Sequence, residues 1–183
     1  MVTGLLDSAR AQPTAAAAGA IAVIGLATIG GFFFFQYALG YPPCPLCLEQ
    51  RIAYYICVPL AAMILLGTSV NSSRKVLALA LFAIAAAMLY NAGLGTYHAG
   101  IEYHWWAGPQ DCSATMPDFS KGGSLLDQIN KSRVIRCDEA AWRLFGISLA
   151  GYNALVSLVL VRIALWGGLA TWRAAQGSSS VSQ

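Results

Sequence analysis

The stretch TAAAAGAIAVIGLATIGGFFFFQYALG, residues 14–40, contains no charged side chain. A helix needs about 20 apolar residues to cross about 30 Å of hydrocarbon, and this stretch is long enough. The apolar core of a secretory signal peptide is shorter, about 7–15 residues. The length therefore predicts a membrane-spanning helix, and a cleaved signal is the disfavoured interpretation.

Three further apolar runs follow: IAYYICVPLAAMILLG (52–67), VLALALFAIAAAMLYNAGLG (76–95) and LFGISLAGYNALVSLVLV (144–161). The first of these is long enough only if its helix begins at the preceding cysteine pair. The chain is 57% hydrophobic and 10% charged, whereas soluble domains contain about 25% charged residues. None of the runs alternates with a period of two, so closed β-barrels are excluded and helices satisfy the backbone. The sequence predicts an all-α membrane protein, a bundle of four transmembrane helices.

The predicted organisation is a single membrane domain over residues 1–183. One long extramembrane loop separates the third and fourth helices. The expected spans are about 14–36, 46–67, 76–96 and 144–165, with outer loops 37–45 and 97–143, an inner loop 68–75 and a flexible tail 174–183.

Alternation of the crossings places the loops after the first and third spans on the same face of the membrane. Four of the five cysteines lie in these two loops. Disulfides persist on the oxidising side, so we expect this face to be periplasmic and both termini to be cytoplasmic. Basic residues on the opposite face agree, although the long loop carries several of its own: Arg10, Arg74, Lys75 and Arg173 lie opposite the cysteines. The net charge of +3 is dispersed and indicates no nucleic-acid partner.

The segment YPPCPLCLEQR, residues 41–51, contains a C-x-x-C pair, Cys44 and Cys47. Such a pair can hold zinc, close a structural disulfide or carry electrons. Pro45 is well placed in the first turn of a helix. Free amides and the helix dipole at that end stabilise a thiolate on Cys47, which favours redox chemistry over an inert clip.

The second pair, Cys112 and Cys137, encloses a long loop, and alone it would be interpreted as a structural disulfide. Its position on the same face as the C-x-x-C favours disulfide exchange between the pairs. The wide spacing of this second pair disfavours a four-cysteine zinc site, so no metal is expected. Cys57 lies about 15 Å along the helix from Cys47 and is expected to be a buried thiol that forms no bridge to it.

Arg51 follows Cys47 by four residues, so it lies on the same helix face about one turn deeper. A charge at membrane depth is costly and often functional, although an arginine at a helix end also anchors to lipid headgroups. His98, at the outer end of the third span, could approach the same region. An interfacial histidine that only makes hydrogen bonds is the alternative.

The sequence resembles the DsbB family through CPLCLEQR (44–51), TYHAGIEYHWWAGPQDC (96–112) and IRCDEAAWRLFGISLAGYNA (135–154). The resemblance implies a bacterial inner-membrane protein that reoxidises a periplasmic thioredoxin-fold oxidant (DsbA-like) and passes electrons to a quinone, ubiquinone or menaquinone. A relay of this kind, from DsbA through DsbB to quinone, keeps the bacterial periplasm oxidising.

The resemblance also implies roles for individual residues. Cys44 and Cys47 correspond to the redox pair next to the quinone, and Cys112 and Cys137 to the pair that meets the partner. Arg51 corresponds to the arginine of the quinone site. Some members carry an acidic residue just before that arginine, whereas this chain has Gln50, so the resemblance does not extend to a role for charge at this position.

Two other functions are compatible with the pattern. One is a quinone reductase similar to vitamin K epoxide reductase, also a four-helix protein with paired cysteines. The other is a membrane scaffold or transporter whose disulfides only hold the outer loop. Reduction of quinone by added thiols would separate both enzymes from the scaffold.

Overall fold

The structure, a computed structural model, describes residues 12–109 and 137–180. Cys112 and most of the predicted outer loop lie outside these residues. Within the two described ranges, four helices are long and apolar enough to cross a membrane, as predicted. They are α2 (Pro13–Phe33), which continues as the π-helix η1 (Phe34–Ala38), α3 (Pro45–Ser69), α4 (Arg74–Glu102) and α6 (Leu149–Ser180). Both α2 and α3 begin with a proline, which suits a position where a missing N–H costs nothing.

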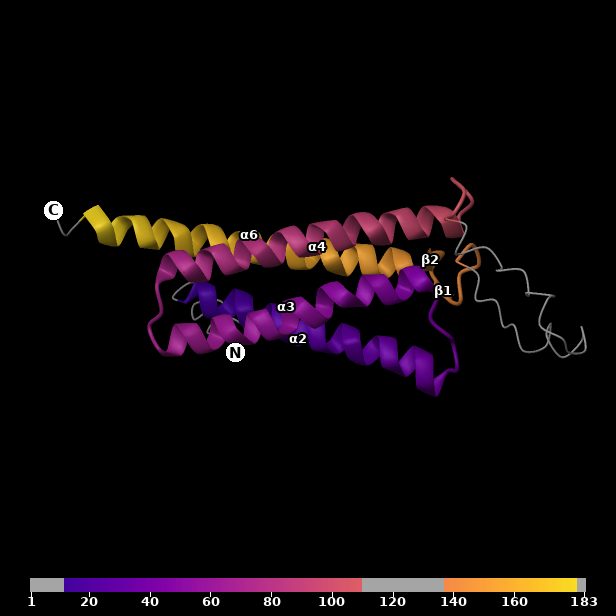
Figure 1. Cartoon of the computed structure of the whole chain (residues 1–183), viewed down its shortest axis with the longest axis horizontal. Helices are drawn as coiled ribbons and strands as arrows, with labels where there is room; N and C mark the ends of the chain where they lie inside the picture. The colour runs from indigo at the N-terminus through magenta and orange to yellow at the C-terminus, as the bar shows by residue number, and fades with distance from the viewer. Residues whose placement is uncertain (1–11, 110–136, 181–183) are drawn as a thin grey trace, which may run out of the picture.

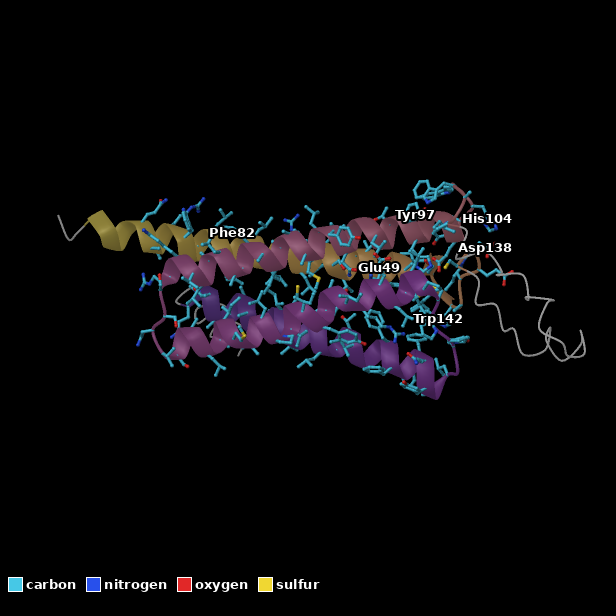
Figure 2. All side chains as sticks on the ribbon, viewed as in Figure 1. Glu49, Phe82, Tyr97, His104, Asp138 and Trp142 are labelled. Carbon is cyan, nitrogen blue, oxygen red and sulfur yellow. The ribbon has the colours of Figure 1, made fainter. Side chains whose placement is uncertain are left out.

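The four helices run side by side, with α2 beside α3 and α4 beside α6 (Figure 1). The link between α2 and α3 lies at one end of the bundle, together with the chain on either side of the undescribed segment (Figure 1). We call this the cysteine end; Asp138 and Trp142 also lie there (Figure 2). The α3–α4 turn and the C-terminal end of α6 lie at the opposite end of the bundle. The two cysteine-bearing segments therefore share one end, as the alternation of spans requires.

Two helix boundaries differ from the predicted ones. Helix α4 continues through His98 to Glu102, because packing buries both polar side chains. Helix α6 begins only at Leu149, after a short antiparallel hairpin of β1 (Arg143–Leu144) and β2 (Ile147–Ser148). The hairpin turn places Phe145 and Gly146 at φ values of 49° and 79°, which interrupts a run that hydropathy alone reads as helix.

Helix α6 also extends beyond the predicted start of the tail at residue 174, to Ser180. The described part of the predicted tail, residues 174–180, is therefore helical. Its composition of Gly and Ser indicated a flexible segment, but the helix of the last span continues without a break.

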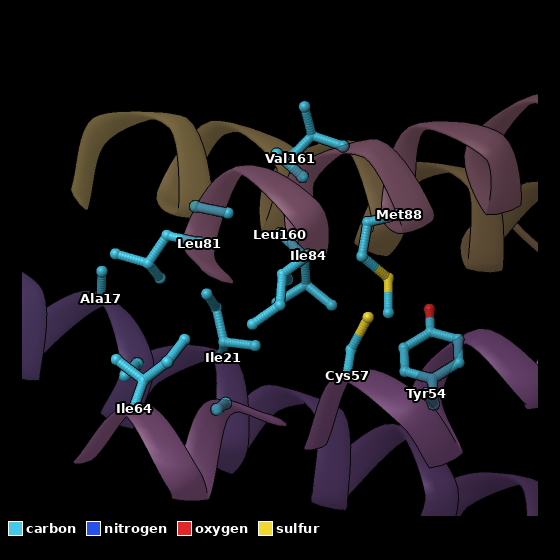
Figure 3. Packing of buried hydrophobic residues seen from close by; sticks show 14 of the residues in the cluster. Ala17, Ile21, Tyr54, Cys57, Ile64, Leu81, Ile84, Met88, Leu160 and Val161 are labelled. Atoms are coloured by element: carbon cyan, nitrogen blue, oxygen red, sulfur yellow. The ribbon is translucent and has the colours of Figure 1, made fainter. Parts of the chain in front are cut away.

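The main core lies between all four helices and consists of aliphatic side chains with Tyr54 and Cys57 (Figure 3). Cys57 is buried and free, as predicted. Helices α4 and α6 approach closely at Gly95, where a Cβ atom would lie 3.1 Å from the backbone nitrogen of Ala154. This contact brings the polar side chains of the two helices near the cysteine end within reach of one another.

Candidate active site

Cys44 and Cys47 form the start of α3. Cys44 is the N-cap residue, and its sulfur accepts the backbone N–H of Cys47 at 3.2 Å. The Cys44 thiol also donates to the Cys47 sulfur, with the two sulfurs 2.7 Å apart and both cysteines free. This hydrogen bond, followed by burial, raises the pKa of the Cys44 thiol above its ordinary value. A proton is therefore held on Cys44 while Cys47 accepts it, which favours negative charge on Cys47.

The asymmetry predicts different reactivity for the two thiols. In the reduced protein at pH 7, iodoacetamide should label Cys47 first, because only the thiolate reacts. The labelling rate of Cys44 should be at least about tenfold lower than that of Cys47. A raised pKa means that labelling of Cys44 keeps increasing with pH beyond the range of an ordinary thiol. Peptide mass mapping in a Cys57→Ala background measures both rates. Equal rates at pH 7 would contradict the assignment.

Cys137 lies beside this pair. It is 1% exposed, forms a disulfide, and packs in one small cluster with Cys44, Leu46 and Ile101. Cys47 is partly buried against the same cluster. The structure thus brings Cys44, Cys47 and Cys137 together, whereas Cys112 lies outside the described residues.

Arg51 is buried against α2 and does not extend away from the bundle. Its side chain is 7% exposed, its Nη1 donates to Oε1 of Gln36 at 2.6 Å, and its guanidinium lies 5.2 Å from the centre of the Phe32 ring. Its Nε has no hydrogen-bond partner among the described residues. Arg51 also interacts electrostatically with Cys47. This geometry fits a site residue better than a lipid anchor.

A pocket of about 80 Å³ lies next to these side chains. Its walls are mainly apolar and come from α2, the proline-rich link and α6. The polar side chains that reach it include Cys47, Gln50, Arg51, His98 and Asn153. A planar apolar ligand with one or two acceptor oxygens matches such walls.

His98 joins the cysteine pair from α4. Its Nε2 lies 3.6 Å from the Cys44 sulfur, and its Nδ1 lies 2.8 Å from Nε2 of Gln50. Nε2 also faces Oε1 of Glu102 at 3.9 Å. The histidine is 2% exposed, so it is an interior residue of the site.

The sequence reasoning missed Glu102, Gln36 and Asn153. Glu102 is buried, and its Oε2 has no hydrogen-bond partner among the described residues. The spacing His98–Glu102, one helical turn, was an available signal, but it fell beyond the predicted end of the third span. Gln36 and Asn153 are polar residues within apolar runs, which is itself a functional signal.

The ligand atoms of Cys44, Cys47 and His98 lie within 4.8 Å of one another. Two sulfurs on one tetrahedral zinc ion, each at about 2.3 Å, would be about 3.8 Å apart. The observed separation of 2.7 Å is shorter, so this geometry suits a dithiol that closes a disulfide.

Comparisons with known proteins also point to disulfide chemistry. A family model described as "Disulfide bond formation protein DsbB" matches residues 14–167. The chain is 32% identical to disulfide bond formation protein B 1 of Pseudomonas fluorescens over 155 residues, 78% of this chain and 82% of the relative. It is 28% identical to disulfide bond formation protein B of Albidiferax ferrireducens over 178 residues, 90% of this chain and 91% of that relative. No solved structure matches the chain.

The family match covers most of the chain and reaches into all four apolar helices, ending at residue 167 within α6. Together these findings indicate a multi-pass inner-membrane protein that takes part in disulfide bond formation, and they support a disulfide oxidoreductase. The C-x-x-C pair at the start of α3 is part of the matched region. The chain belongs to the DsbB family of disulfide bond formation proteins.

Proposed function

We propose that the protein is a membrane thiol oxidase that reoxidises a periplasmic thioredoxin-fold disulfide donor (DsbA-like) and passes the electrons to a membrane quinone, ubiquinone or menaquinone. The cysteine end faces the periplasm and both termini lie in the cytoplasm. The observation that carries the proposal is the packing of Cys137 against Cys44 beside a pocket that contains a buried arginine.

The outer disulfide joins Cys137 to Cys112. Two observations support this pairing: Cys137 is disulfide-bonded, and the other three described cysteines are free. A thiolate of the reduced partner attacks this bond, forms a mixed disulfide and releases the second outer cysteine as a thiolate. Since Cys137 is buried, Cys112 is the sulfur that the partner attacks.

The released Cys137 thiolate then attacks the Cys44 sulfur and breaks the Cys44–Cys47 bond. Cys47 leaves as a thiolate, so one disulfide forms for each that breaks. The contact between Cys137 and Cys44 supports this order. The Cys47 side faces the pocket, where its negative charge is stabilised by Arg51 and by the N-terminus of α3.

A quinone fits the residues that line the pocket. The unpartnered Nε of Arg51 is a buried donor in mainly apolar walls, which suits a carbonyl oxygen. His98 lines the same pocket and supplies a second polar side chain. When bound, a quinone supplies the two-electron acceptor that restores the inner disulfide. The chain's own residues exclude water around Cys47 and orient the acceptor.

The scaffold interpretation does not account for two free, adjacent thiols, one of which, Cys47, lines the pocket. A quinone reductase similar to vitamin K epoxide reductase would share the inner pair. It would differ in its thiol donor, so the partner assay described next separates the two enzymes.

Single serine variants of the outer pair test the relay. Neither variant can form the Cys112–Cys137 bond that the reduced partner attacks, so with a reduced thioredoxin-fold partner and quinone both Cys137→Ser and Cys112→Ser should lose sustained partner oxidation. With the oxidised partner, the Cys112 thiolate of Cys137→Ser should attack the partner's disulfide and form a mixed disulfide, whereas the buried Cys137 of Cys112→Ser should form none. Partner oxidation rates measure the first result, and non-reducing gels measure the second. Partner oxidation at the normal rate in both variants would make the outer pair structural and contradict the proposed function.

A further inference from the structure

A buried row of polar side chains runs from the middle of the bundle to the redox pair. Next to His98, the Gln50 side chain bridges to Asn153, whose Nδ2 lies 2.5 Å from Oε1 of Gln50. The Tyr54 hydroxyl lies 2.7 Å from Oδ1 of Asn153. All four side chains are at most 4% exposed. Polar groups at this depth are costly unless each is paired, so the pairing of each group in the row is a condition of its burial.

We propose that Gln50 and Asn153 are positioning residues that hold His98 neutral, with its proton on Nε2, the ring nitrogen that faces the redox pair. The inference rests on the proposed function for its purpose, because it explains how the inner pair is prepared for electron transfer. Its geometry stands independently of that function.

The Nε2 side of the ring indicates where the proton lies. Nε2 faces the Cys44 sulfur and the Glu102 carboxylate, and the backbone of Cys137 also hydrogen-bonds this ring. The single thiol proton of Cys44 is directed to Cys47. Nε2 is therefore surrounded by acceptors, and a ring nitrogen among acceptors carries the proton.

The Nδ1 side leads to the same answer through the amides. If Nδ1 has a lone pair, Gln50 must present its NH₂ group to it and its oxygen to Asn153. Asn153 then donates to Gln50 and presents its own oxygen to the Tyr54 hydroxyl, which donates. This is the arrangement in the structure. The orientation of an amide is assigned from such networks, and this orientation pairs a donor with an acceptor at each contact from His98 to Tyr54.

The hydroxyl groups at the far end of the row are paired as well. Because the Tyr54 proton is used on Asn153, Ser157 donates to the Tyr54 oxygen at 3.2 Å, and Asn91 donates to Ser157 at 3.0 Å. Every hydrogen bond thus points the same way, toward the cysteines. Aligned hydrogen bonds polarise one another in a low-dielectric interior.

The NH₂ group of Gln50 also opposes the imidazolium form. A protonated ring carries a second N–H on Nδ1, which would face the two amide protons of Gln50. The charged groups around His98 have opposing effects on its protonation. Glu102 and a thiolate at Cys47 favour the imidazolium form, and Arg51 disfavours it. Arg143 interacts with Glu102 and weakens its effect. The described part of α6 contributes only uncharged groups here, so the amide contact decides.

The consequence concerns Cys47. With the proton on Nε2, His98 donates toward the Cys44 sulfur, and the Cys44 thiol donates to Cys47. Two successive donors therefore stabilise negative charge on the sulfur next to the pocket. A carboxylate at position 50 would instead accept a proton from Nδ1 and stabilise an imidazolium.

Nitrogen-15 NMR of the full chain, reduced and labelled in histidine, tests the proposal directly. The sequence has only two histidines, and a His104→Gln variant assigns their signals. For His98 at pH 7 we expect a pyridine-like Nδ1 and a pyrrole-like Nε2. A proton on Nδ1, alone or together with one on Nε2, would overturn the proposal. This outcome does not depend on quinone turnover, so it is distinct from failure of the proposed function.

Variants test the roles of the two amides. Gln50→Glu should convert His98 to a ring with both nitrogens protonated. Asn153→Leu should release the Gln50 amide and give a mixture of tautomers, with iodoacetamide labelling of Cys47 about tenfold slower, the value of one lost charged hydrogen bond. Thr171→Val is the control: it removes a buried hydroxyl of α6 at the opposite end of the bundle. It should change neither the His98 spectrum nor the labelling rate of Cys47. Wild-type spectra and labelling in both amide variants would contradict the proposal.

Discussion

Arg51→Ala is expected to slow electron transfer from the inner cysteine pair to quinone by about 10²–10³-fold, the usual cost of removing one preorganised donor at a reacting centre. Helix formation, membrane insertion and the outer disulfide should be retained. Quinone reduction by purified protein with excess partner or dithiothreitol measures the rate, and quinone titration measures binding separately.

The size of the effect follows from the position of the guanidinium. It is buried in a mainly apolar pocket, where charge interactions are weakly screened. Its Nε has no hydrogen-bond partner among the described residues, while Gln36 and Phe32 hold the rest of the group in place. Loss of the group removes both a donor for the acceptor oxygen and the positive charge near Cys47. Both binding and chemistry should therefore suffer.

Two variants separate charge from geometry. Arg51→Lys keeps the charge but loses the planar fork, so its rate should be intermediate. Gln36→Leu keeps the guanidinium but removes the acceptor that holds Nη1, so it should reduce the rate less than Arg51→Ala. Normal quinone affinity and turnover in Arg51→Ala would return this residue to the role of a lipid anchor.

The second large effect is expected at the inner pair. Cys44→Ala and Cys47→Ala should each abolish sustained turnover, because the outer disulfide, once reduced by the partner, has no oxidant. At most one equivalent of partner is then oxidised per protein. A burst measurement with excess reduced partner counts the equivalents.

Cys44→Ser is the matched control for structure in that experiment. A serine at this position still offers an N-cap oxygen to α3, so a loss of turnover in Cys44→Ser reports the missing sulfur and not a frayed helix. Sustained turnover in any of these variants would show that electrons leave the outer pair by another route.

Hydropathy and length were sufficient to predict the four helices, and the parity of the crossings was sufficient to place both cysteine-bearing segments at one end. The boundaries near the site were not predictable in this way. Hydropathy ended the third span before His98 because the following residues are polar, yet packing against the cysteine end buries them. It started the fourth span too early because the hairpin before Leu149 is apolar and its turn depends on backbone conformation at Phe145 and Gly146.

The same limit applies to the site. The C-x-x-C pair and the i, i+4 position of Arg51 are local patterns, and local patterns are visible in a sequence. The partners of these residues come from other helices: Gln36 from η1, Glu102 from α4 and Asn153 from α6. Such pairings depend on the rotation of each helix about its axis, which hydropathy defines poorly in helices that are apolar on most sides.

The N-cap of α3 has a thermodynamic consequence. The first turn of this helix is closed by the Cys44 sulfur, and a thiol or thiolate accepts an N–H better than a disulfide sulfur does. Helix capping and reduction of the inner pair therefore favour each other reciprocally. A cap contributes about 0.5–2 kcal/mol, and about 1.4 kcal/mol corresponds to about 30 mV for a two-electron couple. The end of a membrane helix thus raises the reduction potential of the inner pair by tens of millivolts, the direction in which electrons must move from the outer pair.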